Sequence, residues 1–207
     1  MNISQRTLVF ALAIGALTAP ILAEARQLGN GGTTYSSLMA RTRPEEFLGR
    51  FIEVAQADLA ANTALLNALK APEATRPSNS ALASLDMKAS TADISNATSA
   101  AAALHQLATQ TVAAHAPLNE ADKANFASAA QALSLVARNI ADLTKNIGAT
   151  KQALAGAGAP ARVALYAARN TSDLAEQLRA EVKAVVAFAS ANQIALAPEV
   201  IEAAAAM

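Results

Sequence analysis

A seven-residue hydrophobic repeat between residues 126 and 147 is the feature that most limits the folds open to this chain. Its members alternate in steps of three and four: Phe126, Ala129, Leu133, Val136, Ile140, Leu143 and Ile147. This spacing lines one face of an α-helix and does not fit a β-strand, whose side chains alternate with a period of two. The residues that flank this seam are small or polar. We therefore predict a long helix that packs closely on its neighbours.

Similar spacing continues in three other segments, and the composition agrees with it. Alanine is abundant, whereas the chain has only five Phe, two Tyr and no Trp. Alanine enters a helix without a side-chain entropy cost, and Val and Ile, which favour strands, are sparse. We predict four long helices, near residues 44–70, 91–115, 119–147 and 160–191.

Helix-start signals support these boundaries. Pro44 suits a first helical turn, and the acidic residues that follow it interact favourably with the helix dipole. Asn119 followed by Asp122 resembles a capped start after Pro117, and Pro160 opens the last long helix.

The connections complete the predicted fold. Residues 71–90 form the longest link, with a short helix around 81–88, whereas residues 148–159 are expected to be a glycine-bearing break. Two short links out of three favour an all-α, antiparallel up-down four-helix bundle over residues 44–192. Residues 193–207 are expected to form a tail with one short helical turn.

The first 25 residues have the pattern of a secretory signal peptide. Arg6 precedes the apolar run 7–22, and Ala23 and Ala25 stand at the third and first positions before the expected cut. We predict cleavage after Ala25 and export to the periplasm, with secretion beyond it as the alternative location.

An uncleaved membrane anchor is the rival interpretation of this segment. Gly15 and Pro20 oppose it. A spanning helix needs about 20 apolar residues, and Pro20 would break this segment. Without cysteine the chain has neither a lipid-modified Cys nor disulfides, and its formal net charge of zero does not suit nucleic-acid binding. We expect a soluble mature protein without integral membrane insertion, whose partner is another exported or envelope protein; a homo-oligomer remains open.

Residues 26–43 should form an extended or disordered arm, because they are rich in glycine and hydroxyl side chains and carry three arginines without an acid. We consider it as a partner-binding arm through Arg26, Tyr35, Arg41 and Arg43. The simpler alternative is a linker. Apolar side chains outside the seams, such as Leu135, are another candidate contact surface, although such residues usually pack on neighbouring helices.

The chain has two histidines, and their spacing argues against a shared metal site. His105 and His115 are ten residues apart on one predicted helix, so they point in different directions and lie about 15 Å apart along its axis. We expect His105 at the surface or on a half-buried flank. His115, at the end of its helix, should interact with the C-terminal dipole.

No catalytic, metal or cofactor site is expected from the remaining residues. The acidic residues of the first helix should form a solvated face: Glu45, Glu46, Glu53 and Asp58. Covalent haem attachment would require cysteine. A non-covalent haem would need His105 or His115 together with Met39 or Met87, and neither methionine lies on a long helix.

Two asparagines occupy seam positions. Asn62 lies near the end of the first predicted helix and Asn170 near the start of the last, so antiparallel packing would bring them to one height. We hypothesise a buried amide pair that fixes the register of the helices, as core asparagines do in coiled coils. In the alternative, at least one of them faces solvent.

These observations favour an exported, non-catalytic helical bundle that acts as an interaction, structural or chaperone-like module. The alternative is a periplasmic bundle that binds a hydrophobic small molecule or a non-covalent cofactor. An enzyme is disfavoured, because no nucleophile and base stand in a recognisable pattern.

Overall fold

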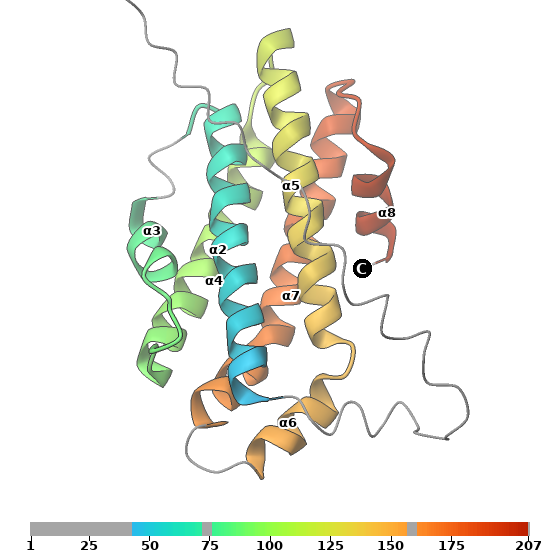
Figure 1. Cartoon of the computed structure of the whole chain (residues 1–207). Coiled ribbons are helices and arrows are strands. Elements are labelled where there is room, and N and C mark those ends of the chain that lie inside the picture. The colour runs from blue at the N-terminus through green and yellow to red at the C-terminus, as the bar shows by residue number, and fades with distance from the viewer. Residues whose placement is uncertain (1–42, 72–75, 157–160, 207) are drawn as a thin grey trace, which may run out of the picture.

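The described part of the protein is entirely helical, as the periodicity predicts. The computed structural model describes residues 43–71, 76–156 and 161–206, which form seven helices and no strand (Figure 1). The helices are α2 (Pro44–Ala68), α3 (Arg76–Ala83), α4 (Thr91–Ala114), α5 (Glu120–Thr144), α6 (Ile147–Ala155), α7 (Ala161–Ala191) and α8 (Pro198–Ala206). The predicted signal peptide and the arm up to residue 42 lie outside the described residues.

Local capping explains where the long helices begin. Pro44 is the first residue of α2. At the start of α4 the Ser90 hydroxyl accepts a hydrogen bond from the Asp93 amide, and the Asp93 carboxylate accepts one from the Ser90 amide. The Asn119 side chain caps α5 by accepting a hydrogen bond from the Asp122 amide at 2.9 Å, as its sequence signal predicts.

The four long helices lie side by side, but α4 does not run in the direction that we expected (Figure 1). The end of α4 lies beside the end of α2, where His115 contacts the Leu69 carbonyl oxygen at 2.9 Å. Lys70 of the same end pairs with Asp122 at the start of α5. Helices α2 and α4 therefore run in the same direction, and α5 runs in the opposite one. The predicted up-down order is wrong at this step.

The long connection between α2 and α4 makes this arrangement feasible. It includes α3, which begins five residues earlier than we expected and packs against α4 and α2. Leu82 and Leu85 anchor the connection because both are buried. The chain thus returns along the first helix before α4 begins, which a short turn would not permit.

Two segments that we expected to be loose are ordered helices. Residues 147–155, which include most of the expected break, form α6, and Leu154 is buried as this helix packs against α7. The expected tail contains α8, which packs on α5 and α7 and buries Val200 and Ala203. In both segments a few buried apolar contacts outweigh weak local signals, so the packed unit extends to residue 206.

Alanine is the main contact residue of α4. Ala97, Ala101 and Ala108 are each at most 1 % exposed, and several alanines of α7 are equally buried. Methyl side chains let helix backbones approach closely, so α4 can fit between α2 and α7 although it carries few large apolar residues.

The close approach of α4 can be tested by enlarging one buried alanine. We expect Ala108→Leu to lower the free energy of unfolding by about 1–3 kcal/mol, because the added carbons overfill a packed interior. The matched change Ala103→Leu, at an exposed position of the same helix, should shift it by less than about 0.5 kcal/mol. Urea unfolding followed by circular dichroism measures both, and equal effects would contradict this packing.

Candidate functional site

The described residues place His105 in the interior of the protein, so the expectation of a surface or half-buried histidine is wrong. Its exposed fraction is 2 %. His105 lies four residues after Ala101 and three before Ala108, and both alanines are buried. These spacings put the imidazole on the buried face of α4. Because the surrounding side chains are small, α2 and α7 come close enough to contact it.

Two carboxylates from different helices hold this imidazole. Its Nδ1 lies 2.5 Å from Glu181 Oε2 of α7, and its Nε2 lies 3.2 Å from Asp58 Oδ2 of α2. Glu181 is 0 % exposed and Asp58 is 3 % exposed. The expectation that Asp58 belongs to a solvated face is therefore wrong, whereas Glu45, Glu46 and Glu53 of the same helix are exposed.

The burial of both carboxylates has a signal in the sequence, although we did not predict it. Asp58 lies seven residues after Phe51 and seven before Leu65, and all three are buried. Glu181 stands in the same relation to Leu174 and Phe188. Each acid thus occupies a core position of a seven-residue repeat, which indicates burial in spite of its charge.

Asn62 belongs to the same cluster. Its side-chain amide donates hydrogen bonds to Asp58 Oδ1 at 3.0 Å and to the Asp58 backbone oxygen at 3.3 Å. Asn62 is 0 % exposed. Its side chain lies near enough to Glu181 to lower the pKa of that carboxyl group. We call Asp58, Asn62, His105 and Glu181 the core cluster.

The hypothesised pair of Asn62 and Asn170 is not among the contacts of the described residues. The Asn170 amide donates instead to the Tyr166 carbonyl oxygen of its own helix. The side chain of α7 that lies near Asn62 is Glu181. Glu181 comes eleven residues after Asn170, which corresponds to about 16 Å along an α-helix. The hypothesis assumed that α2 and the last long helix are antiparallel, whereas the core cluster lies toward the C-terminal end of both.

Burial and charge together determine the protonation of the core cluster. Burial lowers the pKa of His105, but the two carboxylates, Asp58 first, outweigh it and raise the pKa to about 10. Burial raises the pKa of Glu181 to about 7, because the lowering effect of His105 is smaller than the cost of burying its charge. At neutral pH His105 is therefore an imidazolium that faces two acids.

The cluster is arranged for internal hydrogen bonding rather than for holding a metal ion. The two ring nitrogens point to different carboxylates, so His105 separates Asp58 from Glu181. Within the described ranges, no group of three or more His, Asp or Glu side chains is placed to hold a metal ion.

Two concave regions meet at His105. On one side is a small cavity with about 20 Å³ of free space, enough for about one water molecule, which Asp58 and apolar side chains also line. On the other side, a surface groove between α4 and α7 has alanines and polar side chains in its walls: Ala102, Gln106, Thr109, Gln177 and Ala180. The imidazole thus lies between the interior and a groove that opens to solvent.

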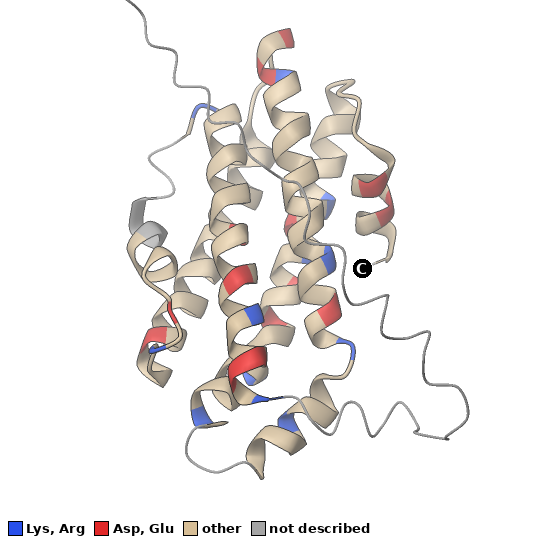
Figure 2. Cartoon of the chain, viewed as in Figure 1, with Lys and Arg blue, Asp and Glu red and all other residues tan. Residues whose placement is uncertain are grey.

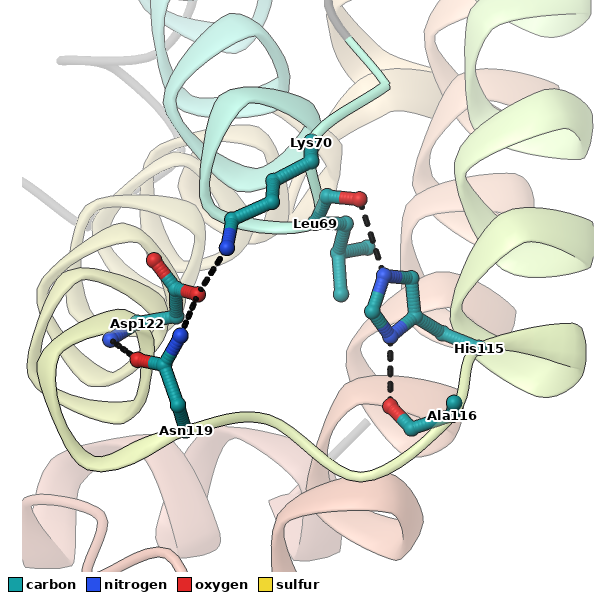
Figure 3. Close-up of polar contacts among 6 residues, drawn as sticks. All are labelled: Leu69, Lys70, His115, Ala116, Asn119 and Asp122. Atoms are coloured by element: carbon teal, nitrogen blue, oxygen red, sulfur yellow. Dashed lines mark hydrogen bonds and ion pairs between the residues drawn. The ribbon is translucent and has the colours of Figure 1, made fainter.

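The second histidine contacts the end of a neighbouring helix rather than its own. His115 is the C-cap residue of α4, and its Nε2 and Nδ1 lie 2.9 Å and 2.6 Å from the carbonyl oxygens of Leu69 and Ala116 (Figure 3). Figure 3 also shows Lys70, at the same end of α2, pointing toward Asp122. The two side chains form an ion pair of 2.7 Å. These contacts tie the end of α2 to the α4–α5 connection.

Of the predicted arm residues, the structure describes only Arg43. It is the N-cap residue of α2, its side chain is exposed, and its carbonyl oxygen accepts hydrogen bonds from the Glu46 and Phe47 amides. Arg26, Tyr35 and Arg41 lie outside the described residues, as does Met39. Met87 is 50 % exposed and lies in the connection after α3.

No protein-family model, curated protein or solved structure matches this chain. Among the helices that the structure describes, none is long and apolar enough to cross a membrane.

Replacing His105 should show how strongly the core cluster depends on its positive charge. We expect His105→Leu to lower the free energy of unfolding by about 3–5 kcal/mol at pH 7, because two buried acids lose their cation. The adjacent Gln106→Leu at an exposed position is the matched control and should change it by less than about 0.5 kcal/mol. Urea unfolding tests both variants, and a His105→Leu variant as stable as the control would contradict the assigned role.

The shifted pKa values predict that stability falls as pH rises. The pKa of His105 lies above its ordinary 6.5, so its contribution is complete below pH 6.5 and is lost as pH rises through about 10. The pKa of Glu181 rises from 4.5 to about 7, so the folded protein loses stability between these values as well. The urea midpoint should therefore be higher at pH 5.5 than at pH 9. A midpoint that is constant or rises over this range would contradict the cluster's protonation.

Proposed function

We propose that this protein is an exported, non-catalytic helical module that works by contacting another exported or envelope protein, in an interaction, structural or chaperone-like role. The observation that carries this proposal is the core cluster. In the described part of the chain, this cluster is where buried ionisable side chains contact one another, through ion pairs between His105 and the two acids. Such a cluster stabilises and orients helices, which leaves the surface as the region for function.

The same proposal includes a four-helix bundle as the scaffold. Helix α2 packs on α4 and α5, and α7 packs on the same two, which supports a square of four helices. In this bundle α5 runs antiparallel to the other three, because Phe188 near the end of α7 contacts His115 at the end of α4 and Phe126 near the start of α5. The core cluster joins the three helices that share one direction.

Export rests on the pattern of the first 25 residues. The basic start, apolar run and small residues before Arg26 support cleavage by a signal peptidase. We propose a periplasmic location for the mature protein, with secretion as the alternative, and a soluble form after cleavage.

The surface charge supports a protein partner better than a nucleic acid. The net charge is zero, and Figure 2 shows acidic and basic residues interspersed along the helices. A nucleic-acid interface would need a basic face. The proposed contact region is the arm with Arg26, Tyr35, Arg41 and Arg43, which directly precedes α2.

The alternative, a bundle that binds a hydrophobic small molecule, has less support. The cavity beside His105 is lined mainly by apolar side chains, but its free space of about 20 Å³ is far below that of a ligand pocket. A ligand of ordinary size would require the helices to separate.

A single expression experiment tests export and contact together. We expect the full chain, expressed in a bacterium with a C-terminal tag and a photo-crosslinking amino acid in place of Tyr35, to yield a periplasmic protein whose intact mass begins at Arg26. Illumination should produce one defined crosslinked product. The purified protein should carry no small molecule in native mass spectrometry.

The matched control places the crosslinker at Ala103, an exposed position on α4. It should give a correctly cleaved protein without that product. An uncleaved cytoplasmic chain would overturn the proposed export. The same products from both positions would overturn the arm as contact region, and a retained apolar molecule would favour the alternative.

A further inference from the structure

Three buried oxygen atoms of the core cluster lack a hydrogen-bond partner: Asp58 Oδ2, Asn62 Oδ1 and Glu181 Oε1. Asp58 Oδ2 still has an ion-pair contact with His105 Nε2 at 3.2 Å, so Asn62 Oδ1 and Glu181 Oε1 are the two that no ion pair compensates. A buried acceptor without a donor costs about 1–3 kcal/mol, and a charged one costs more. Two of them in one small cluster indicate that a hydrogen atom is missing from the simple picture of two carboxylates and an imidazolium.

The existing donors are already used. Both contacts of the Asn62 amide nitrogen go to Asp58. The two ring nitrogens of His105 face Asp58 and Glu181. The remaining source of a donor within the cluster is a proton on Glu181 itself, whose carboxyl group lies near the Asn62 side chain. That side chain lowers the pKa of Glu181, but by less than burial raises it.

We propose that Glu181 binds a proton on Oε1 and donates it to Asn62 Oδ1, which closes a hydrogen-bonded ring that tightens α7 against α2 and α4 and loosens when pH rises. In this ring Asn62 donates to Asp58 Oδ1, and His105 Nε2 forms an ion pair with Asp58 Oδ2. His105 Nδ1 donates to Glu181 Oε2, and protonated Glu181 donates back to Asn62. The added proton thereby gives both Asn62 Oδ1 and Glu181 Oε1 a partner.

The charge of the ring explains why the proton is held. With Asp58 negative, His105 positive and Glu181 neutral, the buried cluster has no net charge. Loss of the proton leaves one uncompensated negative charge at a side chain that is 0 % exposed. Glu181 faces Asp58 and Asn62 from α2 and His105 from α4, and the described parts of α5, α6 and α8 bring no charged group to it. Burial accordingly raises the pKa of Glu181 to about 7.

The surface groove between α4 and α7 gives the proton a route. His105 is part of the wall of this groove, and so is Gln177, one turn before Glu181 on α7. When Glu181 loses its proton, hydration through this groove would relieve the buried charge, and α7 would separate locally from α4. The ring thus makes the packing of α7 respond to pH, independently of where the protein is located.

The protonation of Glu181 can be measured directly in the unmodified chain. We would label glutamate side-chain carboxyl carbons with ¹³C and follow their NMR signals from pH 4 to pH 9, assigning Glu181 by its absence in Glu181→Gln. The Glu181 signal should titrate near pH 7. A titration of Glu181 at the ordinary glutamate value of 4.5 would overturn the proposal, and the titration itself is followed in the wild-type chain.

Hydrogen exchange tests the coupling to α7. Gln at position 181 supplies an amide donor for Asn62 and an oxygen for His105, but it carries no proton to lose. The ratio of amide exchange rates in α7, wild type over Glu181→Gln at the same pH, should rise severalfold between pH 6 and pH 8.5. The same ratio for Glu176→Gln, an exposed position on α7, should stay near one. A pH-independent ratio for Glu181→Gln would overturn the pH-sensitive packing.

Discussion

The interior of this protein depends on one imidazolium that lies between two carboxyl groups. His105 of α4 faces Asp58 of α2 and Glu181 of α7, so one charged contact joins three helices at a single height. Alanine-rich seams pack closely but distinguish poorly between neighbouring registers, since one methyl group resembles another. A buried charged group tolerates no such shift, because a displaced partner leaves a charge unpaired. We therefore interpret the core cluster as the element that fixes how α2, α4 and α7 align.

This alignment constrains the path of the chain. Helices α2, α4 and α7, which contribute the core cluster, run in the same direction, and α2 and α4 are consecutive long helices. After α2 the chain must therefore run back toward the start of that helix before α4 begins. The connection that contains α3, with its buried Leu82 and Leu85, provides this return. The connection that the sequence marks as longest is thus the one whose length the arrangement requires.

The helices could be predicted from the sequence, but the core cluster could not be assembled from it. Proline, asparagine caps and the 4-3 repeat locate the long helices because they act within one turn of the chain. His105 and Glu181 are 76 residues apart, and no local signal pairs them. The buried state of Asp58 was readable from its position between Phe51 and Leu65, but the usual preference of acids for solvent concealed it. Helix α6 was missed and α8 was expected only as one short turn, because the stability of both comes from docking on α7 and, for α8, also on α5.

The composition of the core cluster argues that it does more than stabilise the fold. Well-packed apolar residues often replace a buried ion pair without loss of stability, so the polar group is an expensive way to gain stability alone. For register, one acid beside His105 would be sufficient, and Asp58 provides it. Glu181 is then a second carboxylate for a single positive charge. It has to be either a neutral acid or a source of net negative charge inside the protein. Because no other buried cation is present among the described residues, the neutral acid is the better-balanced state, and the cluster is built to hold a proton as well as to hold three helices.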